Sequence, residues 1–173
     1  MVTPRKILLT GRPGCGKTTL IKRVVNSLAG RTGGFYTEEM REHGARVGFK
    51  LVTLDGKEAV LAHVDFKTPE RVGKYGLDLA ALEAVGVQAI REALRAQRLV
   101  VIDEIGPMEI RSTIFRDAII EAVDSGAHVL GTIAARPLPF IDMVKAGADV
   151  TLIEVRPDNR ERLVSDLIDQ IKT

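Results

Sequence analysis

The 173-residue sequence predicts an α/β fold, in which a mostly parallel β-sheet carries helices on both faces and is extended by an antiparallel meander. Short apolar runs, typical of buried parallel strands, alternate with segments of helical periodicity over most of the chain. A different pattern occupies residues 33–64, where strand-like stretches follow one another with only turn residues between them. The alternation predicts the parallel sheet, and the second pattern predicts the meander.

The first elements are a strand and a helix separated by a glycine-rich turn. Residues 5–10 form an apolar run after a basic start, which predicts a buried strand. Residues 17–28 place Leu20, Ile21 and Val24 at helical spacing, which predicts an amphipathic helix. The strand therefore enters the glycine-rich turn and the helix leaves it.

The later elements follow the two patterns in turn. The meander is expected from strands at 33–41, 45–54 and 58–64, joined by turns at 42–44 and 55–57. We then expect a helix at 77–96 with Gly86 in its middle, a strand at 99–102, a helix at 113–125, a strand at 127–133, a helix at 140–146, a strand at 149–155 and a helix at 158–171. Residues 1–173 are expected to form one domain, because a chain of this length buries about 70% of its unfolded surface.

Composition narrows the class of protein. The chain has 25 basic and 23 acidic residues, and the basic ones are scattered, so nucleic acid is not expected as an obligatory partner. Cys15 is the single cysteine, which excludes an intramolecular disulfide and favours a reducing, cytoplasmic location. The start of the chain leaves no room for a signal peptide, and no apolar run reaches the length of a membrane span. Nothing in the composition indicates a protein partner.

The glycine-rich turn predicts a nucleoside triphosphate site. Residues 11–18 read Gly-Arg-Pro-Gly-Cys-Gly-Lys-Thr and fit the pattern GxxxxGK[ST] between a strand and a helix. The glycines allow positive φ angles, so that backbone N–H groups can turn toward the phosphates, which also face the positive end of the helix. Lys17 is expected to reach the β- and γ-phosphates, and the Thr18 hydroxyl to ligate Mg²⁺. The expected phosphate-binding residues are Gly11, Arg12, Pro13, Gly14, Cys15, Gly16, Lys17, Thr18 and Thr19.

Two consecutive carboxylates predict catalysis. Asp103 and Glu104 follow the apolar strand at 99–102, at the same sheet edge as the phosphate loop. We expect Asp103 to hold Mg²⁺ through its water shell, because this hard cation prefers oxygen ligands. We expect Glu104 to polarise the attacking water as a general base. The pair favours hydrolysis over binding alone.

Phosphoryl transfer needs a positive charge that stabilises the transition state, and an arginine often supplies it. The sequence does not single out one arginine for this role. The candidates are Arg12, Arg111, Arg136 and Arg160. Arg136 follows the strand at 127–133, although a solvated loop arginine is an equal interpretation. Asn159 and Arg160 could instead contact the base or ribose, although Asp158 and Asn159 also suit a plain helix N-cap. The chain contains no Asn-Lys-x-Asp or Thr-Lys-x-Asp element, so we expect loose base selectivity.

Several stretches carry a family resemblance that spans nearly the whole chain. They are Gly-x-Pro-Gly-x-Gly-Lys-Thr-Thr-Leu at 11–20, Gly-Phe-Tyr-Thr-Glu-Glu at 34–39, Gly-Ala-Arg-Val-Gly-Phe at 44–49, Gly-Lys-Tyr at 73–75 and Ile-Asp-Glu-Ile-Gly-Pro-Met-Glu at 102–109. With them the sequence resembles the nucleoside-triphosphatase family of thermophiles and archaea, whose eukaryotic member is called cancer-related nucleoside triphosphatase. The phosphate loop is shared by many ATPases, whereas the other stretches are more specific.

The resemblance implies a RecA-like P-loop NTPase fold with a mixed sheet. It also implies Mg²⁺-dependent hydrolysis of ATP, GTP, CTP, UTP and similar triphosphates to the diphosphate and phosphate. By position it assigns nucleotide binding to residues 11–19 and to a second segment, Leu99, Val100, Val101, Ile102, Asp103, Glu104, Ile105 and Gly106. Pro107 stands where many members have lysine, so no role passes to a lysine there.

Two other functions use the same phosphate loop. A small-molecule or nucleotide kinase would transfer the γ-phosphate to an acceptor, but no arginine-rich lid segment is obvious in the sequence. A nucleotide-switched interaction protein would hydrolyse slowly and release a partner. Glu104 beside Asp103 and the missing guanine-reading element argue mildly against the switch.

Overall fold

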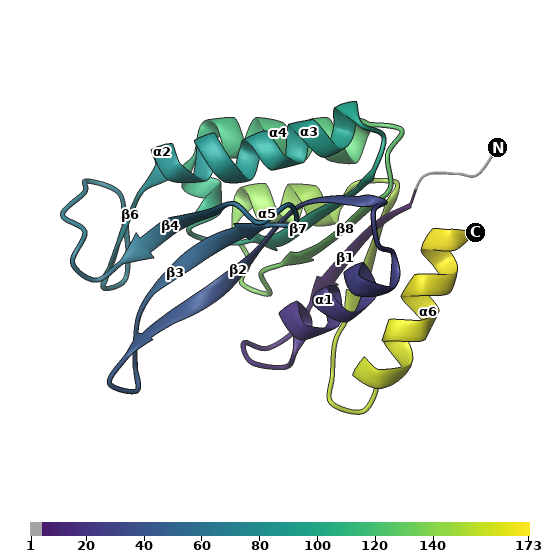
Figure 1. The fold of residues 1–173 in the computed structure, drawn as a ribbon, viewed down its shortest axis with the longest axis horizontal. Helices are drawn as coiled ribbons and strands as arrows, with labels where there is room; N and C mark the ends of the chain where they lie inside the picture. The colour runs from purple at the N-terminus through teal and green to yellow at the C-terminus, as the bar shows by residue number, and fades with distance from the viewer. Residues whose placement is uncertain (1–4) are drawn as a thin grey trace.

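The structure, a computed structural model, describes residues 5–173 and is built around a mixed β-sheet (Figure 1). Within these residues nine strands lie in the order β5-β6-β4-β3-β2-β7-β8-β1-β9. They are β1 (Lys6–Thr10), β2 (Thr32–Glu42), β3 (Ala45–Thr53), β4 (Glu58–His63), β5 (Arg71–Val72), β6 (Tyr75–Leu77), β7 (Leu99–Ile105), β8 (Val129–Ile133) and β9 (Val150–Glu154). Residues 1–4 lie outside the described residues. The expectations that concern them, the single domain 1–173 and the absence of a signal peptide, therefore lie outside the described residues at this end.

The sheet has a parallel half and an antiparallel half. Strands β2, β7, β8, β1 and β9 pair in parallel, and β3, β4, β6 and β5 continue from β2 in antiparallel pairs. Strand β2 belongs to both halves, because its first residues pair with β7 and its later residues extend beyond β7 to pair with β3. The predicted α/β class, with a meander joined to a parallel sheet, is confirmed.

The helices lie in the connections between strands, except the C-terminal one, which follows the last strand. They are α1 (Lys17–Ser27), α2 (Leu79–Ala81), the π-helical segment η1 (Leu82–Val87), α3 (Gln88–Arg95), the 3-10 turn η2 (Glu109–Arg111), α4 (Thr113–Asp124), α5 (Pro139–Lys145) and α6 (Arg160–Lys172). Helices α1 and α6 lie on one face of the sheet, and α3 and α4 lie on the other (Figure 1). The predicted coverage of both faces is confirmed.

The helix expected at 77–96 is confirmed from Leu79 to Arg95 but is wrong at its start. Leu77 belongs to the β5–β6 hairpin, which the sequence analysis missed, and Asp78 begins α2 by accepting a hydrogen bond from the Ala81 backbone N–H at 2.9 Å. The middle is π-helical around Gly86. A Cβ on Gly86 would lie 3.2 Å from Leu82 of the same helix and 3.5 Å from Phe35 of β2, which is an ordinary contact distance, so this part of the helix packs directly on the meander core.

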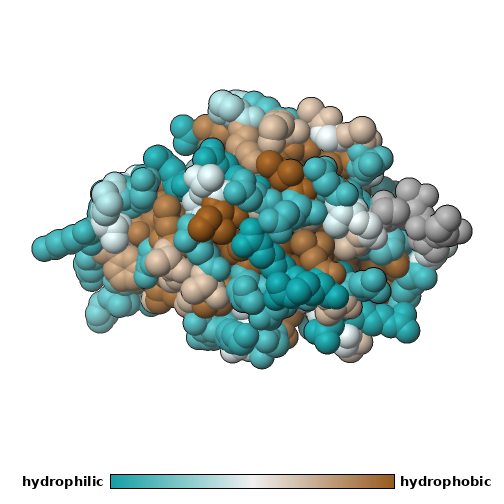
Figure 2. Space-filling model, turned by 90° about the horizontal axis from the view of Figure 1, so that it is seen from above, coloured by the Kyte–Doolittle hydropathy of each residue, from teal (hydrophilic) through white to brown (hydrophobic). Residues whose placement is uncertain are grey.

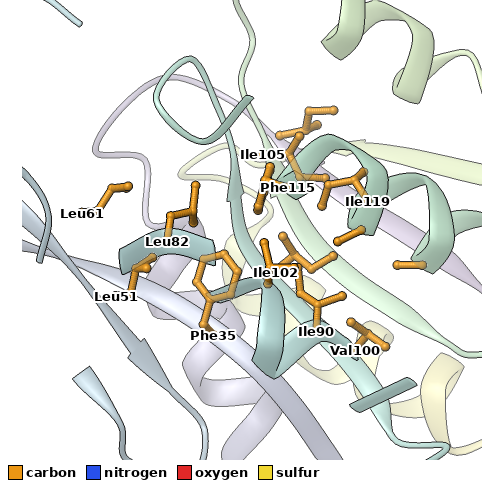
Figure 3. Packing of buried hydrophobic residues seen from close by; sticks show 14 of the residues in the cluster. Phe35, Leu51, Leu61, Leu82, Ile90, Val100, Ile102, Ile105, Phe115 and Ile119 are labelled. Carbon is orange, nitrogen blue, oxygen red and sulfur yellow. The ribbon is translucent and has the colours of Figure 1, made fainter. Parts of the chain in front are cut away.

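Successive residues of the parallel strands point to opposite faces and fill two hydrophobic clusters. In β7, Val100 and Ile102 face α3 and α4, whereas Leu99 and Val101 face α1 and α6. Figure 3 shows Phe35 of β2 between Leu51 of β3 and the strand and helix residues around Ile102. The Phe35 ring meets Phe115 of α4 edge-on, with centroids 6.4 Å apart. The meander and the parallel half therefore share one core.

The surface over α3 and α4 is mixed. Figure 2 shows apolar residues interspersed with polar ones on this side of the molecule. Among them Ile114 and Ile120 are the exposed large side chains of α4. Within the described chain, no helix has the length and apolar character needed to cross a membrane.

Adjacent residues of α4 provide a matched test of this packing. Phe115 is 0% exposed and Ile114 is 43% exposed. Phe115→Ala should lower the free energy of unfolding by about 3–5 kcal/mol, because it removes a buried ring and leaves a cavity. Ile114→Ala should change it by less than about 1 kcal/mol, because its side chain is partly solvated already. Urea unfolding of both variants measures the difference, and similar losses would contradict the core described here.

Candidate active site

The carboxyl ends of β1, β7 and β8 meet at one edge of the sheet, as parallel strands require. The glycine-rich loop, residues 11–16, leaves β1 at this edge and leads into α1. Asp103 lies near the end of β7, and Thr132 lies near the end of β8, which pairs with both β1 and β7. Three separate segments of the chain therefore come together at this edge.

The glycines of the loop adopt conformations that other residues rarely reach. Gly14 and Gly16 have φ angles of 77° and 98°, and Gly16 is the N-cap of α1. Gly11 is needed for close approach, because a Cβ there would lie 2.7 Å from the carbonyl oxygen of Val155. The backbone conformation predicted for these glycines is confirmed.

The Lys17 side chain bonds back to the start of the glycine-rich loop. Its ammonium group donates hydrogen bonds to the carbonyl oxygens of Gly11 at 2.9 Å and Arg12 at 3.2 Å. The Cys15 thiol lies 3.9 Å from the same nitrogen. The charge of Lys17 is therefore held over the concave side of the loop.

Asp103 is the most constrained polar residue of the site. Asp103 is 2% exposed, and both of its carboxylate oxygens accept hydrogen bonds. Thr18 Oγ1 donates to Oδ2 at 2.7 Å, and Thr132 Oγ1 donates to Oδ1 at 2.6 Å. The backbone N–H of Thr37 also faces this carboxylate. Asp103 thus joins β7 to α1, to β8 and to β2.

Thr132 and Thr37 were not among the predicted site residues. Thr132 is a fully buried hydroxyl in an otherwise apolar strand, and it occurs at the carboxyl end, where ligand sites form. That combination was a usable signal. Thr37 acts through its backbone N–H, which no side-chain pattern reveals.

Burial is the main influence on the pKa values of Asp103 and Glu104. Burial raises the pKa of Asp103, and the hydrogen bonds from Thr132, Thr18 and Thr37 oppose that rise. Burial and the neighbouring Asp103 charge raise the pKa of Glu104, and the Lys17 charge opposes them. Glu104 is therefore a stronger base, once ionised, than an exposed glutamate.

Glu104 lines a small cavity on the meander side of β7. The cavity has a volume of about 150 Å³ and is lined by Thr37, Phe49, Val72, Glu104, Pro107, Met108 and Glu109. Gly106 makes room for the Glu104 side chain, because a Cβ there would lie 2.5 Å from Glu104 Oε1. Glu104 is thus directed into a hollow and away from the packed core.

Glu109, which no predicted role included, shares this cavity. It begins η2 and is 5% exposed. Burial raises the pKa of Glu109 well above its ordinary value, and the Glu104 charge adds to the rise. Its signal in the sequence was its place in the Ile-Asp-Glu-Ile-Gly-Pro-Met-Glu stretch.

The second predicted nucleotide-binding segment divides into two groups. Asp103, Glu104 and Gly106 lie at the site. The other side chains are buried in the two hydrophobic clusters and hold β7 in place: Leu99, Val100, Val101, Ile102 and Ile105. Their contribution to the site is structural support for the carboxylates.

Arg160 is the candidate arginine that lies against the phosphate loop. Its Nη1 is 3.6 Å from the position that a Cβ on Gly16 would occupy. A second cavity, of about 200 Å³, lies here and is lined by Gly16, Thr19, Leu20, Arg23, Arg160 and Glu161. Arg23 forms a salt bridge with Glu161 at 2.9 Å, which ties α1 to α6 beside this cavity.

The other candidates are placed differently. Arg111 bonds to the Arg71 carbonyl at 3.4 Å and lies 3.6 Å from a Glu70 oxygen. Arg12 and Arg136 are exposed. Asn159 is the N-cap residue of α6, as one alternative had it, but its side chain makes no capping hydrogen bond: its amide donates to the Glu154 carbonyl and accepts from the Arg156 N–H. Asn159 therefore stabilises the loop between β9 and α6.

Comparison with known proteins places this site in a family. A family model described as NTPase matches residues 6–168. The chain belongs to the NTPase family. The expected family resemblance is confirmed by relatives from bacteria and from human. One is "Nucleoside-triphosphatase THEP1" of Thermotoga sp. (strain RQ2), with 46% identity over 96% of this chain and 95% of the relative. Another is "Cancer-related nucleoside-triphosphatase" of Homo sapiens, with 38% identity over 95% of each chain.

Solved structures of this NTPase family share the fold. The crystal structure of THEP1 from the hyperthermophile Aquifex aeolicus matches with a TM-score of 0.88 and 34% identity, covering 97% of this chain and 99% of that one. The solution structure of a human cancer-related nucleoside triphosphatase matches with a TM-score of 0.82 and 37% identity, covering 97% of each. The sheet order and helical layers described above are therefore those of the family.

The donor set of this NTPase site fits Mg²⁺. In the part of the chain that the structure describes, no group of three or more His, Cys, Asp or Glu side chains forms a complete metal cage. Thr18 Oγ1 and Asp103 Oδ2 lie 2.7 Å apart beside the loop, and these oxygens are of the type that could hold this cation. Mg²⁺ retains several waters and uses few protein oxygens together with substrate phosphates, which matches this pair.

Glu109 gives a pH-dependent prediction. A group whose pKa is raised in the folded state stabilises the fold below its ordinary value, 4.5 for glutamate, and loses that contribution as pH rises through the folded value. Glu109→Gln removes this ionisation. The free energy of unfolding of the variant, relative to the unmodified protein, should therefore increase as pH rises above 4.5. Urea titrations at a series of pH values measure this, and a flat or falling difference would contradict the assignment.

Proposed function

We propose that this NTPase hydrolyses nucleoside 5'-triphosphates to the diphosphate and phosphate, with Mg²⁺ and with little selectivity for the base. One observation carries the proposal: the 2.7 Å hydrogen bond from Thr18 to Asp103 fixes the phosphate loop beside the carboxylates of β7. Loop, metal ligands and general base are then parts of one site. The names of the relatives, which specify a nucleoside triphosphatase and no particular base, support the same function.

The loop and α1 account for phosphate binding. The N–H groups of the loop and the positive end of α1 attract the triphosphate. Lys17 bonds to the carbonyls of Gly11 and Arg12 in the present structure, so its ammonium is already placed over the phosphate position. On binding, we expect it to exchange these carbonyls for β- and γ-phosphate oxygens.

Thr18 and Asp103 would hold the metal beside those phosphates. Bound there, Mg²⁺ would neutralise the negative charge on the β- and γ-phosphate oxygens. Asp103 is pre-set for this task, because Thr132 holds its second oxygen at 2.6 Å and so fixes the direction of the first. The Thr18 hydroxyl would exchange its hydrogen bond to Asp103 for the metal.

Glu104 would activate the water. Its carboxylate borders a cavity of about 150 Å³, which is larger than the roughly 30 Å³ that one water occupies in the liquid. A water there can donate a proton to Glu104 as its oxygen attacks the γ-phosphorus. The bond to the β-phosphate oxygen then breaks, the diphosphate leaves, and the proton passes from Glu104 to phosphate or solvent.

Tolerance for the base follows from the loop between β9 and α6. Asn159, which could have read a base edge, is engaged by the Glu154 and Arg156 backbone. Arg160 is placed beside Gly16 and Thr19. A guanidinium contacts phosphate oxygens or the face of any base, so it adds affinity without selecting one base.

Substitution of Glu104 tests the proposed mechanism. Glu104→Gln should retain Mg·ATP binding and lower the rate of phosphate release by about 100-fold or more, because it removes a general base. Lys17→Ala should abolish turnover. Glu58→Gln, at an exposed carboxylate paired with Lys50, is the matched control and should behave as the unmodified protein. Phosphate release from each common triphosphate, with and without Mg²⁺, is the measurement. An unchanged rate in Glu104→Gln would refute the assigned role.

Arg160 gives a separate prediction. Arg160→Ala should raise KM for every triphosphate by about 10-fold, because it removes a charge-assisted contact on the nucleoside side of the loop. Arg162→Ala, on the exposed side of α6 near Asp166, is the control. Steady-state kinetics with ATP, GTP, CTP and UTP compare the two variants. An effect confined to one base would show that Arg160 reads the base.

A further inference from the structure

Glu109 is a buried acid beside the site, and the mechanism above makes no use of it. It is 5% exposed and lines the same cavity as Glu104. A carboxyl group taken out of water is costly unless nearby groups bind it, so its presence in this position needs a reason. The reason lies in the turn between Glu104 and η2.

Gly106 connects the two glutamates. The Glu104 side chain lies so close to it that a Cβ on Gly106 would be 2.5 Å from Oε1 and 2.9 Å from Cγ. The backbone N–H of Gly106 faces the Glu109 carboxyl group. Its carbonyl oxygen accepts a hydrogen bond from the Ile110 N–H at 3.1 Å. Both the N–H and the carbonyl group of Gly106, next to the Glu104 side chain, therefore bond to residues of η2, namely Glu109 and Ile110.

The turn is anchored by apolar contacts on either side of Gly106. Ile105 is buried in the core, and Met108 and Ile110 pack against it. Pro107 follows Gly106 and has no N–H to donate. The Glu109 carboxyl group is the polar acceptor that holds the Gly106 N–H itself beside Glu104.

We propose that Glu109 is a positioning residue for hydrolysis: by accepting the Gly106 N–H, it fixes the backbone that supports Glu104 and so aims the Glu104 carboxylate at the water. The proposal rests on the proposed function, because it assigns Glu104 the role of general base. Glu109 itself touches neither nucleotide nor metal in this scheme. Its contribution should appear in kcat and not in KM.

A double-mutant cycle between positions 104 and 109 tests the proposal. Glu109→Ala should lower kcat for Mg·ATP by about 10- to 100-fold, because a misplaced catalytic group loses rate steeply with small displacements. KM should stay within about twofold of its original value, the usual error of such comparisons. In the Glu104→Ala background, Glu109→Ala should cause no further loss, since the group that it positions is already gone.

Two further variants keep the test independent of folding. Glu109→Gln keeps an amide oxygen that can accept the Gly106 N–H, so it should restore most of kcat. Gly106→Ala leaves Glu109 in place but pushes against Glu104, so it should also lower kcat at constant KM. Glu83→Ala is the matched control: Glu83 accepts a hydrogen bond from Ser112 at 2.7 Å near the same turn, and its loss should leave kcat unchanged.

The outcomes separate this proposal from the proposed function. If Glu104→Ala lowers kcat but Glu109→Ala does not, or if the two losses simply multiply, Glu109 does not position Glu104. Equal losses in Glu109→Gln and Glu109→Ala would also overturn the proposal. If Glu104→Ala itself leaves kcat unchanged, the proposed function fails first. Thermal unfolding of each variant identifies any loss that comes from misfolding. If Glu109→Ala misfolds, the kcat of Glu109→Gln decides: a value near that of the unmodified protein supports the proposal, and a loss at unchanged stability overturns it.

Discussion

The buried carboxylate of Asp103 is the point on which the architecture of the site depends. It lies in a strand with hydrophobic clusters on both sides, and Thr18 and Thr132 bind its two oxygens at 2.7 and 2.6 Å. A buried charge is tolerated only when such donors are supplied. Meeting that requirement brings the start of α1 and the end of β8 to the same point. The position of the phosphate loop relative to β7 is therefore set by the hydrogen bonds of one side chain.

The rest of the fold serves this edge in different ways. The parallel half supplies the strand ends. Gly11 allows the loop to pass close to the carbonyl group of Val155, which directly follows β9, the neighbour of β1. The meander supplies the outer wall, because β2 continues past β7 and brings Thr37 and, through β3, Phe49 to the cavity. The Phe35–Phe115 contact locks that wall to α4. A change in the meander core is thus connected physically to the space in front of Glu104.

Much of the fold was predictable because its signals are local. The strand before the loop, the helix after it and the carboxylates at the end of β7 all follow from short patterns of apolar and polar residues, and the structure has each of them. The short β5–β6 hairpin was missed, since its strands, Arg71–Val72 and Tyr75–Leu77, are too short to show alternation. The π-helical segment Leu82–Val87 was predicted only as helix. Apolar periodicity does not distinguish a single π-helical turn from the α-helix around it.

The same distinction holds within the site. Gly16, Lys17, Thr18 and Asp103 could be named from motif spacing, and their expected neighbourhood is what the structure shows. Thr132 and Glu109 carry signals in the sequence, a polar residue at an apolar strand end and a place in a specific stretch, but these signals give no role, because the roles come from contacts between distant segments. Thr37 acts through its backbone N–H, which no side-chain pattern reveals. The arginines show the limit most clearly. None of their sequence contexts decides between them, and it is the packing of α6 on α1 that places Arg160 beside Gly16.

The central claim is that the loop and the carboxylates of β7 act together on one triphosphate. A crystal structure of Glu104→Gln grown with Mg²⁺ and ATP tests it most directly. The account predicts an intact triphosphate in the loop, Mg²⁺ bound by the Thr18 hydroxyl on the side of Asp103, and the γ-phosphate facing residue 104 across the cavity. A γ-phosphate directed away from residue 104, or a metal bound apart from Thr18 and Asp103, would contradict it.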